Sequence, residues 1–316
     1  MRPTRVCIAL LLGTPPLAAA AAQEGTVPPI VGRWDITAQG PRGSYPSWLE
    51  VSVSGFGTLV GRFVGQVGSS RPISHVLTAG DTLRFAIPPQ WQREPGDLRV
   101  EAVRTGDRLT GTFVNPDGSR HTWTAVRAPS LKRTAAPAWG TPVALFDGKS
   151  LAGWTTVPGS GENKWTVANG LLTAGGGGAN LVTTRKFGDF KLHAEFRLPT
   201  GSNSGIYLRG RYEVQIEEDE GRGEEPRPID IGGVYGFLSP NENAARAPNE
   251  WQTYDITLVG RRVTVVLNGH TVIADQIIPG ITGGALDSDE GTPGPIYLQG
   301  DHGKVEFRKV VITPAR

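Results

Sequence analysis

Two segments of the chain alternate between apolar side chains and side chains that could perform acid–base chemistry. Because successive side chains along a β-strand point to opposite faces, Glu195 would leave one face of its strand while Phe196 enters the other. The same alternation puts Glu213, Gln215 and Glu217 together on one face of a later strand. A solvated sheet face normally mixes Thr, Ser and Lys, whereas this one concentrates carboxylates and an amide. The pattern predicts a site for a polar ligand such as a sugar.

The composition predicts that β-strands carry these side chains. The chain of 316 residues contains 43 Gly and 25 Pro and has no long helical period. Short alternating segments separated by Gly, Pro, Asn and Asp are typical of an all-β fold. The length is sufficient for two domains.

A first domain is predicted at residues 28–127. Short alternating segments recur there, with turn signals such as Thr105-Gly-Asp107 between them. A meander of this kind predicts a small antiparallel β-barrel or sandwich. Since no acid–base residues cluster in it, we expect structural or interaction support, with a ligand-binding barrel as the alternative. The sequence does not identify its partner.

A linker and a second domain follow. Residues 128–141 carry Pro and lack apolar periodicity, which indicates a linker, and the second domain is predicted at residues 142–316. Asn268 and Gly269 separate two apolar-rich segments, and both tolerate the positive φ of a type I′ turn, so they predict a hairpin. Strands of this number and length fit two packed antiparallel sheets, a jelly-roll sandwich.

The beginning of the chain predicts export. Residues 1–22 contain a basic start, an apolar run and a stretch of small residues, which is the pattern of a secretory signal peptide. Its removal would take away Cys7, the single cysteine, and leave equal numbers of basic and acidic residues. We therefore expect a periplasmic or secreted protein without a membrane span after cleavage. Without a basic stripe, nucleic acid is not an expected partner.

Several motifs of the second domain, taken together, resemble the 3-keto-disaccharide hydrolase domain family. The motifs are Leu145-Phe-Asp-Gly-Lys-Ser-Leu-Ala-Gly-Trp154, Asn203-Ser-Gly-Ile-Tyr-Leu-Arg-Gly210, Tyr212-Glu-Val-Gln-Ile216 and Pro293-Gly-Pro-Ile-Tyr-Leu-Gln-Gly-Asp-His-Gly303. The resemblance covers the second domain and none of the first. It implies a concanavalin A-like jelly roll and cleavage of glycosides that carry a ketone at C3.

Cleavage of a 3-keto sugar requires three kinds of group. The ketone acidifies the proton on C2, so a base can remove it, and the resulting enolate expels the substituent at C1 before water adds. With the resemblance, Glu195 or Glu213 is the expected base, Arg209 the stabiliser of the enolate oxygen, and His302 the proton donor. Five further residues are expected to orient hydroxyl groups of the substrate: Asn203, Tyr207, Gln215, Gln299 and Asp301.

Structural roles compete with these assignments. Arg209 with Glu195 or Glu213 could form an ion pair between neighbouring strands. His302 follows Asp301 in a Gly-flanked turn, where both residue types are common because they tolerate turn geometry.

Two other functions stay open. A retaining glycosidase on the same fold would need two carboxylates about 5–5.5 Å apart. Glu213 and Glu217 alternate suitably, but they are separated by roughly 13 Å of strand rise. A non-catalytic carbohydrate-binding module would use exposed aromatic side chains for stacking on sugar rings. Tyr207 and Tyr235 are available for this, whereas Trp154 and Trp251 are expected in the core.

Metal binding is also open. Asp287, Asp289 and Glu290, with Asp301, offer the oxygen ligands that Ca²⁺ prefers. Their spacing does not match an EF-hand loop, and a solvated acidic turn is the other interpretation. No cofactor is required by the sequence, and Ca²⁺ is the metal it would favour.

Overall fold

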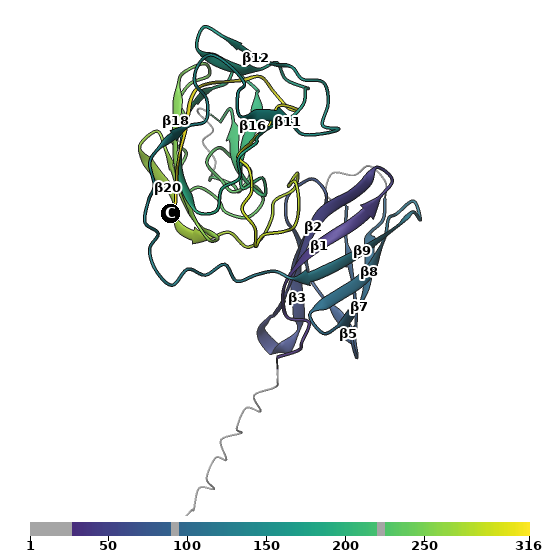
Figure 1. Ribbon diagram of the computed structural model, residues 1–316. Helices are drawn as coiled ribbons and strands as arrows, with labels where there is room; N and C mark the ends of the chain where they lie inside the picture. Colours follow the sequence, from purple (N-terminus) through teal and green to yellow (C-terminus); the bar gives the residue numbers. More distant parts are fainter. Residues whose placement is uncertain (1–26, 90–94, 220–224) are drawn as a thin grey trace, which may run out of the picture.

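The computed structural model describes residues 27–89, 95–219 and 225–316. Within these residues the fold is all-β, apart from a short 3-10 turn at Gly55–Gly57, and the strands form three sheets (Figure 1). In this part of the chain, no helix is long and apolar enough to cross a membrane. The predicted signal peptide, residues 1–22, lies outside the described residues.

The first sheet is an antiparallel meander that folds around its own core. Its spatial order is β4-β3-β2-β1-β9-β8-β7-β6-β5, and it curls until β4 contacts β6. Buried side chains include Trp34, Phe63 and Trp123. The strands are β1 (Gly32–Gly40), β2 (Gly43–Val53), β3 (Leu59–Val64), β4 (Arg71–Ile73), β5 (Leu77–Ala79), β6 (Thr82–Ile87), β7 (Leu98–Thr105), β8 (Arg108–Val114) and β9 (Arg120–Arg127). The chain leaves the sheet between Ile73 and Leu77, so β4 and β5 are separate short strands at its two ends.

The remaining strands form two sheets that face each other across a second core. The larger sheet has the order β12-β13-β22-β15-β18-β19-β20 with β10 beside β22, and the smaller has the order β11-β14-β21-β16-β17. The strands are β10 (Val143–Ala144), β11 (Trp154–Thr156), β12 (Trp165–Ala168), β13 (Leu171–Ala174), β14 (Leu181–Thr183), β15 (Phe190–Arg197), β16 (Asn203–Leu208), β17 (Tyr212–Glu217), β18 (Gln252–Val259), β19 (Arg262–Leu267), β20 (His270–Ile277), β21 (Tyr297–Leu298) and β22 (Val305–Pro314).

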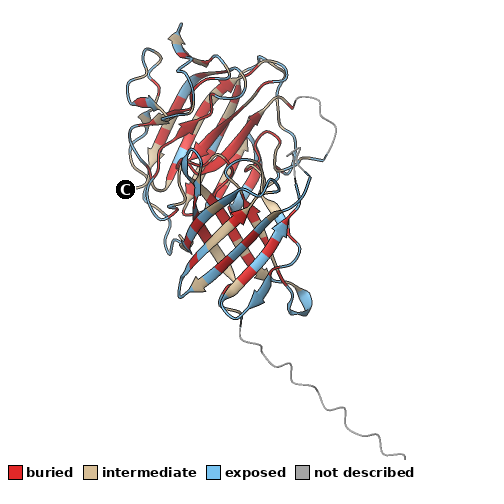
Figure 2. Cartoon of the chain, turned by 90° about the vertical axis from the view of Figure 1, so that its right-hand side faces the viewer, coloured by how far each residue is buried: buried red, intermediate tan, exposed pale blue. Residues whose placement is uncertain are grey.

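This pair of sheets is the jelly-roll sandwich expected from the sequence. Figure 2 shows buried residues concentrated on the strands of both the meander and the sandwich. The hairpin predicted at Asn268 and Gly269 is confirmed, since both residues have positive φ, of 53° and 88°, between β19 and β20.

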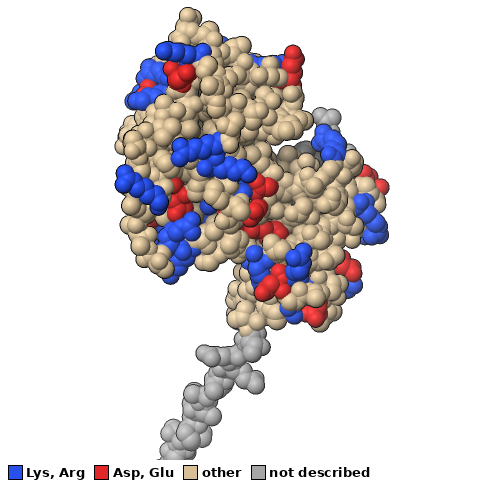
Figure 3. Space-filling view, viewed as in Figure 1, with Lys and Arg blue, Asp and Glu red and all other residues tan. Residues whose placement is uncertain are grey.

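The two cores are not fully separate. Trp48 and Val64, from β2 and β3 of the meander, belong to the hydrophobic cluster of the sandwich. Residues 128–141 run along the outside of the sandwich (Figure 1), where Arg133 forms an ion pair with Asp189. On the face drawn in Figure 3, basic and acidic side chains are interspersed.

Candidate functional site

A cavity opens on the face of the smaller sheet that is turned away from the core. Its volume is about 140 Å³. The strands β16, β17 and β21 line it, because their odd-numbered side chains leave the core while Ile206, Val214 and Leu298 enter it. Seven residues expected at a site from the sequence line this cavity together: Asn203, Tyr207, Glu213, Gln215, Gln299, Asp301 and His302.

Glu213 is the buried acid of the cavity. Its side chain accepts a hydrogen bond from the Tyr207 hydroxyl at 2.9 Å, and the residue is 3% exposed. Gly205 on the neighbouring strand makes room for the carboxyl group, since a Cβ at that position would overlap Glu213 Oε1. Burial raises the pKa of Glu213 to about 8, although the Tyr207 hydrogen bond and the charge of His302 oppose this.

Asp301 and His302 form a coupled pair at the same cavity. His302 Nδ1 lies 2.7 Å from Asp301 Oδ1. Asn180 Nδ2 donates to Asp301 Oδ2 at 3.2 Å, and Asn180 Oδ1 accepts from the backbone N–H of Gly300. The bond to Asp301 raises the pKa of His302, against the opposing effect of burial. Burial alone would raise the pKa of Asp301, but the bonds from His302 and Asn180 lower it.

Two buried amide side chains line the cavity, and their oxygen atoms have no hydrogen-bond partner among the described residues. Gln215 and Gln299 are 3% and 6% exposed, and among the described residues their Oε1 atoms have no hydrogen-bond partner. A buried amide oxygen without a partner costs about 1–3 kcal/mol of stability, so such groups normally meet a bound ligand or water. The two amides therefore favour a polar, hydroxyl-rich ligand.

Three tyrosines complete the cavity, and only Tyr207 was predicted to be a site residue of the enzyme. Tyr297 stacks on Tyr207 with 4.2 Å between ring centroids and 9° between planes. Tyr235 also lines the cavity, although it was considered only as a stacking residue of a binding module. The alternation of side chains along a strand could have identified Tyr297, because it precedes Gln299 by two residues and so points to the same face.

Glu195 does not lie in the cavity, and its assignment to the site is corrected. The parity of β15 is as predicted, with Leu192 and Phe196 in the core. However, β15 belongs to the larger sheet, so its polar face is the opposite outer surface of the sandwich. There Glu195 accepts a hydrogen bond from Arg308 at 2.5 Å and lies 3.5 Å from Lys309.

Arg209 is also absent from the cavity. The strand β16 ends at Leu208, and Arg209 has a left-handed φ of 53°, which breaks the alternation that would have continued towards the site. Its guanidinium is buried, where Nη2 donates to the Gly260 carbonyl at 2.7 Å and to the Tyr212 hydroxyl at 3.1 Å. Arg209 therefore holds the fold together, and it does not pair with Glu195 or Glu213.

The acidic residues considered for Ca²⁺ are dispersed. Asp287 accepts from Arg211 Nε at 2.6 Å, while Asp301 belongs to the cavity. Glu290 is fully buried and accepts from the Tyr212 hydroxyl at 2.6 Å, so it is not part of a solvated turn. These residues do not come together as a group that could hold a metal ion, so the structure does not support the Ca²⁺ alternative at this segment.

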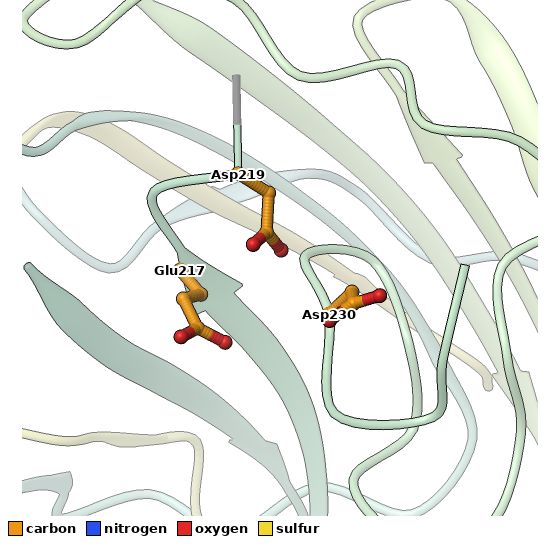
Figure 4. A group of neighbouring side chains, drawn as sticks. All are labelled: Glu217, Asp219 and Asp230. Carbon is orange, nitrogen blue, oxygen red and sulfur yellow. The ribbon is translucent and has the colours of Figure 1, made fainter. Parts of the chain in front are cut away.

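A different cluster of acidic side chains lies at the end of β17 and in the segments that follow it. Ligand atoms of Glu217, Asp219 and Asp230 are within 4.8 Å of one another (Figure 4). Asp219 Oδ2 accepts from the backbone N–H of Ile231, and Asp230 accepts from the guanidinium of Arg227 at 2.9 Å. Because a cationic side chain already contacts this group, it gives no independent sign of a metal. Glu217 belongs here and does not line the cavity with Glu213.

Comparison with known proteins identifies the family. Residues 141–313 match the 3-keto-alpha-glucoside-1,2-lyase-like domain family. This chain belongs to that family. A 3-keto-disaccharide hydrolase from Bacteroides thetaiotaomicron is 33% identical over 114 residues, which cover 32% of this chain and 38% of that protein. The chain thus matches less than two fifths of the length of this curated relative.

Two solved structures are similar to part of this chain. Both are described as candidate glycosyl hydrolases from Parabacteroides distasonis. The first is 28% identical, covers 57% of this chain and 92% of its own, and gives a TM-score of 0.47. The second is 20% identical, covers 55% of this chain and 94% of its own, and gives a TM-score of 0.44.

Proposed function

We propose that the protein cleaves the glycosidic bond of 3-keto glycosides in the cavity of the smaller sheet. The observation that carries this proposal is a buried carboxyl group, Glu213, which shares a cavity with the Asp301–His302 pair and with two amide oxygens that have no partner among the described residues. Family membership supports it, as does the name of the Bacteroides relative, a 3-keto-disaccharide hydrolase. The small volume fits one sugar ring, because sites for larger ligands measure roughly 300–1,000 Å³.

Glu213 acts as the base that removes the proton from C2. A carboxylate whose pKa is raised to about 8 is a stronger base than an ordinary one, and its ionised form is needed for proton removal. The positive charge of His302 favours that ionised form. Gly205 leaves the space in which the carboxyl group lies beside the substrate ring.

His302 delivers a proton to the departing oxygen at C1. The bond to Asp301 raises the pKa of His302, so its imidazole stays protonated to a higher pH than an ordinary histidine does. Asn180 orients Asp301, and Asp301 orients the imidazole through Nδ1. The other ring nitrogen, Nε2, is therefore the atom that donates the proton.

The side-chain N–H groups of Gln215 and Gln299 donate to the enolate oxygen at C3, the role predicted for Arg209 from the sequence, while their Oε1 atoms accept hydrogen bonds from substrate hydroxyl groups. Amide donors in a site with little water stabilise developing negative charge without carrying a full charge themselves. Both side chains are buried and line the cavity. The position of Arg209 in the core makes this replacement necessary.

Electrons and protons balance over two stages. In the first, the C2–H proton passes to Glu213, the C1–O bond breaks, a C1=C2 double bond forms, and the departing oxygen takes a proton from His302. In the second, water adds to C1 of the unsaturated ketone and gives a proton to His302, Glu213 returns its proton to C2, and the net reaction is hydrolysis with both side chains back in their starting states. A lyase reaction stops after the first stage.

The test is direct incubation with an oxidised and an unoxidised substrate. The full chain is mixed with 3-keto-trehalose or trehalose, and products are followed by mass spectrometry and by the ultraviolet absorption of the conjugated ketone. Cleavage of 3-keto-trehalose alone is expected. Cleavage of trehalose alone would instead indicate ordinary glycosidase chemistry, and binding of both without turnover would indicate a carbohydrate-binding module.

We also propose that this reaction takes place outside the cytoplasm, on the basis of the pattern in residues 1–22. Expression of the full chain in a bacterial host, followed by mass analysis of the periplasmic fraction, should give a protein that starts near Gln23. Recovery of the uncleaved chain from the cytoplasm alone would contradict this.

A further inference from the structure

The wall of the cavity is not built by the family domain alone. Val67 and Gly68 also line it, and both lie in the loop between β3 and β4 of the meander. The region that matches the family begins at residue 141, so these two residues are outside it. The meander therefore contributes part of the site.

Close backbone contacts place this loop. The Gly284 N–H donates to the Gln66 carbonyl at 2.9 Å. A Cβ on Gly283 would overlap the Gly68 carbonyl oxygen, and a Cβ on Gly236 would lie 2.7 Å from Ser69 Cβ. Glycine at these positions lets the loop and the sandwich approach each other without side chains between them.

The strands that carry the loop are anchored in the core of the sandwich. Trp48 on β2 is fully buried, belongs to the sandwich core, and packs edge-to-face on Phe237 at 5.4 Å. Gly280 accommodates it, because a Cβ there would overlap the indole ring. Burial of Trp48 and the adjoining Val64 in the core of the sandwich is typical of a permanent contact between two domains. The loop that follows β3 is therefore held in a defined position.

The loop lies next to the proposed reacting groups. Tyr207, which donates to Glu213, is also 3.0 Å from the carbonyl oxygen of Gly283, the residue that contacts Gly68. Val67 lines the cavity and is 55% exposed, and apart from glycines the other residues that line the cavity are polar or aromatic.

We propose that Val67 and Gly68 form the binding wall for the group attached to C1, and that Val67 determines which leaving groups are accepted. The inference rests on the proposed function. Because the cavity holds about one ring, the second unit of a disaccharide must extend past its rim, where Val67 stands. The meander is then a specificity element of the enzyme, beyond its structural support of the sandwich.

Substitution of Val67→Trp tests this, with Val53→Trp as the matched control. Both side chains are exposed valines of the meander, 55% and 44% exposed, and Val53 does not line the cavity. With 3-keto-trehalose, Val67→Trp is expected to raise KM and lower kcat/KM by about tenfold, the effect of overpacking one contact. With methyl 3-keto-glucoside, whose leaving group is small, the change should stay within about twofold. Equal losses on both substrates, or no loss on either, would overturn the assignment.

A labelling experiment separates this inference from the proposed function. In a Cys7→Ser, Glu213→Gln chain, whose turnover should be about 10³-fold slower than that of the wild type, Val67→Cys carries the only thiol, and Val53→Cys serves as its control. Saturating 3-keto-trehalose should slow iodoacetamide labelling at position 67 and leave position 53 unchanged. Lack of protection at 67 overturns the loop assignment. Protection in a protein whose wild type cleaves neither 3-keto substrate would overturn the cleavage proposal and support the loop assignment.

Discussion

Glu195 and Glu213 both lie on strands that alternate between core and polar side chains, but their surroundings are opposite. Glu195, on the larger sheet, contacts Arg308, Lys309 and His193 at the outer surface. Partial burial alone would raise its pKa, but the hydrogen bonds and charges of these neighbours lower it. Glu213, on the smaller sheet, contacts a tyrosine in a cavity, and burial raises its pKa to about 8.

This difference teaches that strand parity does not distinguish a reactive carboxylate from a structural one. Alternation is the same in both strands, whereas desolvation and charge partners depend on which sheet each strand joins. A carboxylate among cations is stabilised in its charged form and is a weak base. A carboxyl group whose pKa is raised by burial is the better candidate for acid–base chemistry.

The largest effect is expected for activity in Glu213→Gln. Loss of the base should lower kcat on 3-keto-trehalose by about 10³-fold, within the range for general acid–base catalysis. Glu195→Gln, the matched control on the outer surface, should keep kcat within about twofold of the wild type. Steady-state kinetics of the two variants measures the contrast. An equal loss in both would break the comparison between the sheets.

The same substitution is expected to stabilise the fold at alkaline pH. Glu213 has a pKa of about 8 in the folded protein against an ordinary value of 4.5, so the folded state retains a proton that the unfolded state loses. The free energy of unfolding of the wild type should therefore fall as pH rises through this window. Relative to wild type, Glu213→Gln should gain on the order of 3 kcal/mol at pH 8 and little near pH 5, as measured by urea unfolding. A gain independent of pH would contradict the buried titration.

A smaller loss of activity is expected for His302→Asn. Removal of the proton donor should lower kcat by about 10²-fold. In the wild type, activity should rise as Glu213 ionises and fall as His302 loses its proton, and the variant should lose the falling limb. His193→Asn, on the outer surface beside Glu195, is the control and should retain both limbs. A pH profile of kcat/KM distinguishes the two, and an unchanged profile in His302→Asn would exclude the proton-donor role.

The smallest effect concerns stability in Glu195→Gln. Because the folded-state pKa of Glu195 is lowered, its contribution is present at neutral pH and is lost as pH falls through that pKa. Removal of a surface pair of this kind should cost about 0.5–1 kcal/mol at pH 7. Thermal unfolding at low and high salt measures it, and the cost should shrink at about 1 M salt, where charges are screened. A cost that salt does not change would place Glu195 in a less solvated network.

Strand parity predicted most of the cavity. The alternation in β17 put Glu213 and Gln215 on one face, and the structure has them there. Parity alone could not find Val67, because no local pattern marks which distant loop will cover a sheet face. It also failed at Arg209, where a left-handed residue after β16 redirects the side chain into the core.

The amino-acid sequence by itself determined the all-β class, the hairpin at Asn268 and Gly269, and the face on which each side chain leaves its strand, because these depend on local backbone geometry and a period of two. Only the tertiary structure decided which strands share a sheet, and with that the separation of Glu195 from Glu213. Sheet assignment depends on pairing between distant segments and on burial. Burial then raises the pKa of Glu213, and packing between distant segments places Val67 of the meander at the rim of the cavity.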